Sequence, residues 1–144
     1  MTPAELLAAA RGVLAGQSAA PPGGWPRVAA LLARQALENA LDEFWESRPA
    51  TAGLSACPRK SQLACLPFYL APRTAQEAAY TWAALSGACH YHAYELAPTA
   101  GELAGWIDEV ATLMPALHEK TAAPSLAVAQ AAANSKEGDG QRDY

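Results

Sequence analysis

The chain has 144 residues, of which 51% are hydrophobic, and a formal net charge of −4 at pH 7. This length favours a single domain whose core needs neither a disulfide nor a metal to fold. The acidic balance argues against recruitment of nucleic acid by bulk charge. Three cysteines and an amphipathic N-terminus without a secretory core predict a cytoplasmic protein, and no apolar run approaches the ~20 residues that cross a bilayer.

Alanine supplies much of the hydrophobic content and strong β-formers are sparse, which predicts an all-α fold. The first helix is expected to begin at Thr2 and to end before Gly16, because Thr2-Pro3-Ala4-Glu5 forms a capping box with proline at the first helical position. Residues 17–24 then form a loop rich in proline, glycine and serine.

A long second helix is expected over residues 25–47, with apolar side chains at helical spacing along one face. Residues 49–58 are predicted to be a loop. A short apolar helix follows over residues 59–70, and Pro67 should kink or restart it, because the proline ring clashes with the preceding turn.

The fourth helix is expected over residues 73–91 and is apolar on two sides, which is typical of a central helix. One of its faces carries mostly small residues, so a neighbouring helix can approach closely. We therefore expect a homodimer that forms through this helix and the turn after it, with Trp82 and Tyr91 at the interface. The small face consists of Tyr80, Ala83, Ala84, Gly87, Ala88 and Tyr91.

The last helix opens with a second capping box, Thr99-Ala100-Gly101-Glu102, and its apolar residues recur at steps of three and four as far as Leu117. The sequence thus predicts an up-and-down bundle of four to five helices in a single domain, residues 1–120. Residues 121–144 are expected to be a low-complexity and largely disordered tail.

Two histidines and two tyrosines crowd into residues 87–94, Gly-Ala-Cys-His-Tyr-His-Ala-Tyr, at the end of the fourth helix. Leucine or alanine would pack a helix end more simply, so the cluster indicates a function. His90 and His92 are interpreted as surface or interface side chains that favour the helix dipole, as residues of an active-site cleft, or, together with Cys89, as metal ligands. Tyr91 and Tyr94 either stack on bases or bury their rings and bond through their hydroxyls.

The spacing His92-x-Tyr94, followed by Pro98-Thr99, resembles the second half of the Arg-x4-His-x-Tyr signature of HEPN-domain toxin nucleases. Residues 33–41 resemble the long second helix of those domains, and the resemblance covers about residues 25–118. It implies a helical bundle that dimerises through the signature helices. In active members of this family, arginine and histidine from both subunits line one cleft that cleaves RNA without a metal.

Carried over residue by residue, His92 takes the position of the histidine that handles a proton. Tyr94 takes the position of the tyrosine that a partner nucleotidyltransferase modifies in some members. Gly87 stands where the signature has its arginine, and glycine cannot stabilise charge on a phosphate. Three explanations remain open: a natural non-catalytic member, an arginine supplied by Arg34 or Arg73, or an introduced inactivating change.

The distribution of charge bears on these explanations. Residues 74–119 contain six acidic residues and no lysine or arginine, so a phosphate-binding cation must come from elsewhere in the chain. Arg34 is the first candidate, and its alternative role is an ion pair with Glu38, four residues on. Arg59 and Arg73 open helices, where a cation opposes the helix dipole, so either a ligand or details of capping explain them.

We expect a HEPN-like component of a bacterial toxin–antitoxin or defence system, with a ribonuclease-type dimer cleft that is degraded or disabled. The alternatives are a non-catalytic protein-interaction adaptor and a nucleotide-binding helical module. The expected partners are a second copy of the chain and an antitoxin or nucleotidyltransferase-type protein, with RNA as a further ligand; no cofactor, metal or membrane is expected. The expected site comprises His92 as the remaining catalytic residue and His90, Tyr91, Tyr94, Arg34 and Arg73 as binding residues.

Overall fold

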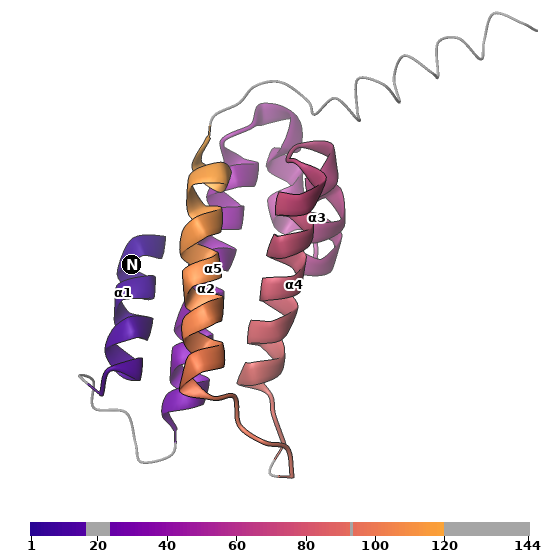
Figure 1. Cartoon of the computed structure of the whole chain (residues 1–144). Helices are drawn as coiled ribbons and strands as arrows, with labels where there is room; N and C mark the ends of the chain where they lie inside the picture. Colours follow the sequence, from indigo (N-terminus) through magenta and orange to yellow (C-terminus); the bar gives the residue numbers. More distant parts are fainter. Residues whose placement is uncertain (17–23, 93, 120–144) are drawn as a thin grey trace, which may run out of the picture.

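The computed structural model describes residues 1–16, 24–92 and 94–119, and all regular structure in these ranges is helical. Four long helices run up and down along one common direction (Figure 1). They are α1 (Pro3–Leu14), α2 (Trp25–Glu46), α4 (Pro72–Cys89) and α5 (Ala100–His118). The prediction of an all-α bundle is confirmed, and the predicted tail lies outside the described residues.

Both predicted capping boxes are present. The Thr2 hydroxyl accepts the Glu5 backbone N–H at 3.2 Å, and the Glu5 carboxylate accepts the Thr2 backbone N–H at 2.7 Å. Thr99 and Glu102 make the same two bonds at 3.1 and 2.9 Å. Each box satisfies backbone donors that the first turn leaves unpaired, which fixes where α1 and α5 begin.

Three short elements join α2 to α4 at one end of the bundle: η1 (Pro49–Ala56), α3 (Arg59–Cys65) and η2 (Leu66–Phe68). The predicted loop over residues 49–58 was wrong for most of its length, because residues 49–56 form 3-10 turns. Thr51 anchors them, since its buried hydroxyl donates to the Trp45 carbonyl at 3.2 Å. The predicted effect of Pro67 is confirmed, because the helix before it ends at Cys65 and the chain restarts as η2.

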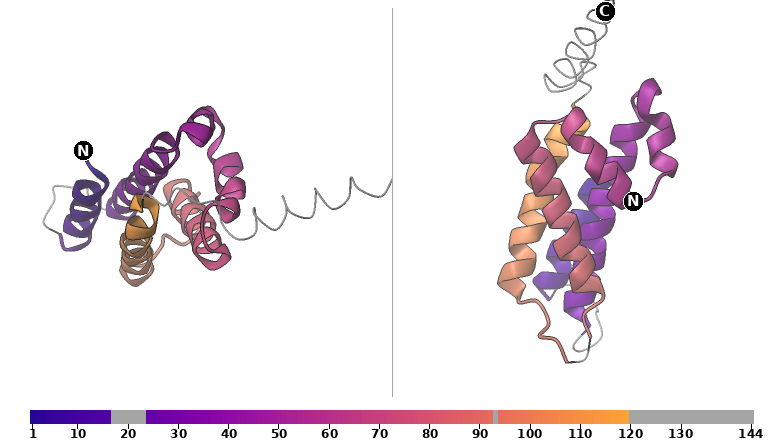
Figure 2. Two further views of the ribbon diagram at one scale, coloured as in Figure 1. Left: turned by 90° about the horizontal axis from the view of Figure 1, so that it is seen from above. Right: turned by 90° about the vertical axis from the view of Figure 1, so that its right-hand side faces the viewer.

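The central helix is α2, which contacts α1, α4, α5 and η1 (Figure 2). Alanines make this possible, because their small side chains let neighbouring helices pack closely on several sides of α2. The largest buried side chains, Trp45 and Phe44, lie near its C-terminal end and stack edge to face, with ring centroids 4.9 Å apart. The fully buried residues of α2 are Ala29, Ala30, Ala33, Ala36, Leu37, Leu41, Phe44 and Trp45.

The prediction that the fourth helix is central was wrong, because α4 buries only one side against the bundle. Ala75, Ala78, Thr81, Leu85 and Ala88 face inward. On its other side Tyr80, Ala83 and Gly87 are exposed. α4 also ends at Cys89, so that Tyr91 lies beyond the helix. None of the helices in the described ranges has the length and apolar content that a membrane span requires.

Candidate functional site

The His/Tyr cluster occupies the connection between α4 and α5, at the end of the bundle away from α3 (Figure 1). A local pair of bonds shapes it. The His92 backbone N–H donates to a carboxylate oxygen of Glu95 at 3.1 Å, and the Glu95 backbone N–H donates to the His92 carbonyl at 3.0 Å. Glu95 therefore holds the backbone of the loop through its carboxylate and its own backbone N–H.

The signature side chains point to solvent. His90 and His92 are both exposed, and among the described residues the imidazole of His92 has no hydrogen-bond or ion-pair partner. Tyr94 and Leu96 have relative exposures of 102% and 97%, the highest of the large hydrophobic side chains that the structure describes. In the described part of the chain, His92 therefore lies at the surface rather than in the interior of the bundle.

Tyr91 behaves differently, because an arginine holds it. The Arg27 guanidinium donates through Nη2 to the Tyr91 carbonyl at 2.6 Å, and its central carbon lies 4.5 Å from the centre of the Tyr91 ring. This is the geometry of a cation–π contact. Arg27 thus brings a positive charge to the loop that carries His92.

Sequence reasoning missed Arg27, although a signal was present. Arg27 lies in the first turn of α2, where a cation opposes the helix dipole, the same feature that singled out Arg59 and Arg73. The antiparallel course of α2 and α4 places the start of one beside the end of the other. That placement is what sets Arg27 against Tyr91.

Arg34 is drawn into a network between α2 and α4. Its Nε lies 3.8 Å from Oε1 of Glu38, so the predicted pair forms, and the same Glu38 oxygen accepts the Trp82 indole N–H at 2.9 Å. Arg34 and Glu38 are largely covered, with 21% and 18% of their side chains exposed. Trp82 was predicted at a dimer interface, but its indole N–H, the only polar group of this side chain, already has a partner within the chain.

Cys89 lies beside this network. Burial raises the pKa of its thiol, the nearby Arg34 opposes the shift, and Glu38 adds to it. A thiol with a raised pKa holds its proton, so Cys89 is a poor nucleophile and a poor metal ligand at neutral pH. The described part of the chain contains no group of three or more His, Cys, Asp or Glu side chains placed to hold a metal ion.

Arg73 cannot serve His92 within one chain. It opens α4, whereas His92 follows the end of this 18-residue helix, which is ~27 Å long. Its Nε pairs with Glu77 at 3.0 Å, and its side chain is 90% exposed. Of the two arginines that the sequence put forward as helpers, neither joins the histidine loop in the way Arg27 does.

The cation at the start of α3 is explained without a ligand. Arg59 bonds to Asp42 at 2.8 Å and to Gln62 at 2.6 Å. The side-chain amide of Gln62, a buried residue, donates to the carbonyls of Ser55 and Cys57 at 3.2 and 3.0 Å. Arg59 therefore ties α3 and η1 to α2.

Gly87 occupies an exposed position in the last turns of α4. A Cβ built on it would meet no atom within 4 Å outside its own helix, so the backbone there accepts a larger side chain. The position that corresponds to the signature arginine is thus sterically open.

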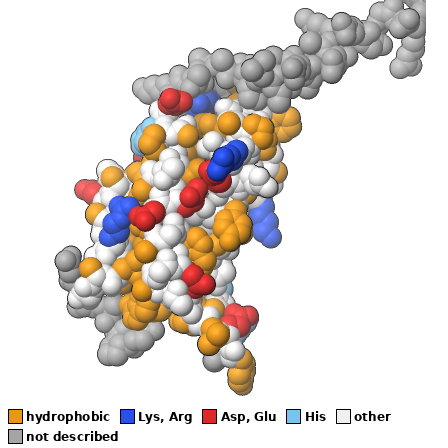
Figure 3. Space-filling model, in the orientation of Figure 1, with side chains coloured by type: hydrophobic (Ala, Val, Ile, Leu, Met, Phe, Trp, Pro, Cys, Tyr) orange, Lys and Arg blue, Asp and Glu red, His pale blue; other side chains and the backbone are white. Residues whose placement is uncertain are grey.

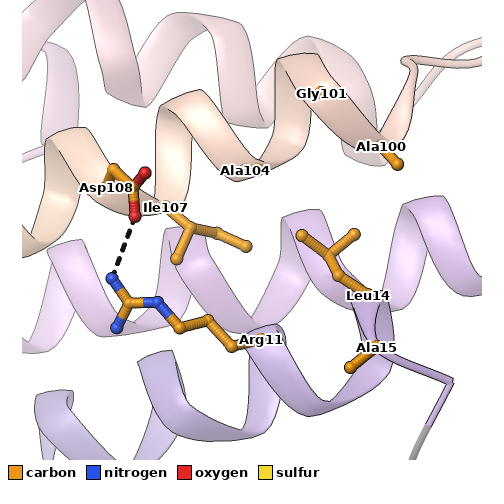
Figure 4. Close-up of a pocket in the computed structure, with 8 residues that line it drawn as sticks. All are labelled: Arg11, Leu14, Ala15, Ala100, Gly101, Ala104, Ile107 and Asp108. Atoms are coloured by element: carbon orange, nitrogen blue, oxygen red, sulfur yellow. Dashed lines mark hydrogen bonds and ion pairs between the residues drawn. The ribbon is translucent and has the colours of Figure 1, made fainter.

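A hollow of about 540 Å³ lies between α1 and α5 (Figure 4). Its walls are small and apolar, and at one end Arg11 reaches across to Asp108, with 3.1 Å between Nη2 and Oδ1. The hollow has no aromatic side chain to stack on a base, and its single cation is already paired. This arrangement gives no support to the nucleotide-binding alternative.

Comparison of the chain with protein families, with curated proteins and with solved structures found no match.

Proposed function

We propose that this protein is a HEPN-like binding module of a bacterial toxin–antitoxin or defence system, and that it works by pairing with a second copy of itself rather than by cleaving RNA. The loop between α4 and α5 is its contact surface. The observation that carries this proposal is the exposure of Tyr94 and Leu96 on that loop. Large side chains of this kind are costly to leave in water and are typical of contact surfaces.

The surface next to this loop suits a second copy. In the last turns of α4, next to the loop, the exposed side chains Ala83 and Gly87 are small, so that another α4 can approach closely there. The loop itself carries His90, His92 and Glu95, and a two-fold axis can set histidines of one copy against the glutamate of the other. Such a contact needs no arginine at position 87.

Replacement of both loop side chains tests the proposal. The natural chain is expected to have the mass of a dimer by light scattering, and Tyr94→Ser/Leu96→Ser that of a monomer at the same concentration. Both side chains project into solvent, so the double substitution should leave folding intact.

The matched control is Phe68→Ser, which removes an exposed aromatic side chain beyond the other end of α4 and should leave the mass unchanged. A natural chain that stays monomeric at all concentrations, or a loop variant that stays dimeric, would refute the proposal.

A second candidate, a metal-independent endoribonuclease, is favoured by one observation. Arg27 places a guanidinium on the loop that carries His92, as a nuclease of this kind requires. In this version His92 moves the proton and Arg27 stabilises the charge on the phosphate. The Arg27 guanidinium is already bonded to Tyr91 and would have to leave it to bind RNA. For this reason we rank the ribonuclease second.

RNA cleavage by the natural chain and by arginine variants tests the second candidate. For this candidate, the natural chain is expected to cleave RNA slowly, Arg27→Ala to abolish that cleavage, and Gly87→Arg, which fits the open space at this position, to increase it. His92→Ala added to the same variant should abolish that cleavage, measured with labelled single-stranded RNA. If Gly87→Arg cleaves no RNA, the ribonuclease version fails, whereas the binding module does not depend on this result.

A further inference from the structure

A small hollow of about 230 Å³ lies between α4 and α5, on a face of the molecule distinct from the histidine loop. Both aromatic and acidic side chains line it. Figure 3 shows hydrophobic side chains exposed over these two helices, with acidic side chains near them. The lining residues are Glu77, Tyr80 and Thr81 of α4 and Gly105, Trp106 and Glu109 of α5.

The two carboxylates that line this hollow favour a positively charged ligand. Glu109 has no ion pair or hydrogen bond among the described residues, and Glu77 is paired only with the exposed Arg73. Apart from Arg73 beside Glu77, the sequence around the hollow offers no cation, because residues 74–119 contain no lysine or arginine. An exposed pair such as Arg73–Glu77 is weak, so an arriving cation can displace Arg73.

The aromatic side chains narrow the choice to an organic cation. Tyr80 is 68% exposed and Trp106 is partly exposed, so both rings can meet a ligand. Aromatic faces attract ammonium groups, and tryptophan does so best. Two carboxylates without a third ligand do not favour a metal ion, and the described residues show no larger cluster here.

Thr81 gives a second and independent sign of a ligand. It is fully buried at the wall of the hollow, with 0% of the residue exposed, and its hydroxyl has no hydrogen-bond partner in the described part of the chain. An unpaired buried hydroxyl costs free energy, and a ligand in the hollow would recover it if a small shift of the wall uncovers the hydroxyl. Gly105 keeps the space open, since a Cβ there would meet no atom within 4 Å.

From these observations we infer that the α4–α5 hollow binds an alkylammonium group, which Glu77 and Glu109 neutralise and Tyr80 and Trp106 cover. The volume suits one such group and its carbon chain rather than a nucleotide, because sites for drug-sized ligands span about 300–1,000 Å³. The group belongs either to a free polyamine or to a lysine of a partner protein. This inference does not depend on the proposed pairing of two copies.

Titration of the full chain, labelled with ¹⁵N, tests the inference. Spermidine is added in one arm and acetyl-Gly-Lys-Gly-amide in the other, at constant ionic strength, while the indole N–H signal of Trp106 is followed by NMR. A saturable shift centred on residues 77–81 and 105–109 is expected. Saturation at lower spermidine concentration assigns the group to a polyamine, and saturation at lower peptide concentration assigns it to a protein lysine.

Two variants and one control make the test specific. Glu109→Gln should weaken binding at least about fivefold, because it removes the unpaired charge. Gly105→Leu should block the hollow without a backbone clash. Asp108→Asn changes charge equally at the next residue, which faces α1 through Arg11, and should leave binding almost unchanged.

The inference is overturned if neither probe produces a saturable shift of Trp106. It is also overturned if Glu109→Gln and Asp108→Asn weaken binding equally, which would mean that the acidic surface only attracts cations in general. If Gly105→Leu fails to fold, Glu109→Gln still decides between these outcomes.

Discussion

Two buried threonines show that the contribution of a hydroxyl to stability depends on whether it has a hydrogen-bond partner. Thr81 is fully buried and its hydroxyl has no partner among the described residues. Valine has nearly the same shape and lacks the hydroxyl that must be desolvated. We expect Thr81→Val to raise the free energy of unfolding by about 1 kcal/mol, measured by urea denaturation.

Thr51 is the matched comparison, because it is also buried but its hydroxyl bonds to the carbonyls of Trp45 and Arg48, each at 3.2 Å. Thr51→Val is therefore expected to lower the free energy of unfolding by about 1 kcal/mol. The two identical substitutions should shift stability in opposite directions. Shifts of the same sign would contradict this account of the hydroxyls.

At this scale the sequence located the histidine cluster but not its environment. Its residue types and spacing singled out His92 and Tyr94, and both proved accessible. The contact between Arg27 and Tyr91 joins residues 64 positions apart, so only the antiparallel placement of their helices reveals it. The pair Arg34–Glu38 was predictable because both residues lie on one helix, whereas the third member, Trp82, comes from another.

Among the elements, α5 depends on its cap. Thr99→Ala removes the hydroxyl that accepts the Glu102 N–H and should lower the free energy of unfolding by about 1 kcal/mol. Thermal unfolding followed by circular dichroism measures the effect.

Thr112→Ala is the control, since this exposed threonine lies within the same helix and its hydroxyl bonds only to the Asp108 carbonyl. Alanine is the better helix former there, so Thr112→Ala should leave stability unchanged or slightly raised. Equal losses in the two variants would show that the capping box is not what matters at Thr99.

The ends of the elements were predictable where local chemistry sets them. The capping boxes fixed the starts of α1 and α5, and Pro67 fixed the break after α3. The 3-10 turns of η1 escaped prediction because their anchor, the bond from Thr51 to the Trp45 carbonyl, joins two elements. Proline, glycine and serine in this stretch indicate a turn equally well, and tertiary contacts decide the outcome.

For the whole molecule, the charge distribution makes a prediction about RNA. The net charge is −4, and the histidine loop lies within 46 residues, 74–119, that contain no lysine or arginine. We expect no retention of single-stranded RNA in a gel-shift assay, even at low salt, because few phosphates can be neutralised. Strong binding that falls steeply with added salt would contradict both this prediction and the ranking of the two candidate functions.

At this scale composition predicted the class of fold but not the role of each helix. Alanine-rich helices with short connections indicate an up-and-down bundle. The sequence favoured residues 73–91 as the central helix because they are apolar on two sides, yet α2 takes that place. Alanine permits both burial and exposure, so a pattern built on alanine does not say which side a helix turns inward.

A bundle arranged around α2 has no seam along which it could divide. Every other long helix lies against α2, so detaching any one of them uncovers part of the same wall of alanines and leucines. The molecule should therefore unfold in one cooperative step. In heavy water, the backbone amide protons in the middle of α2 should exchange most slowly.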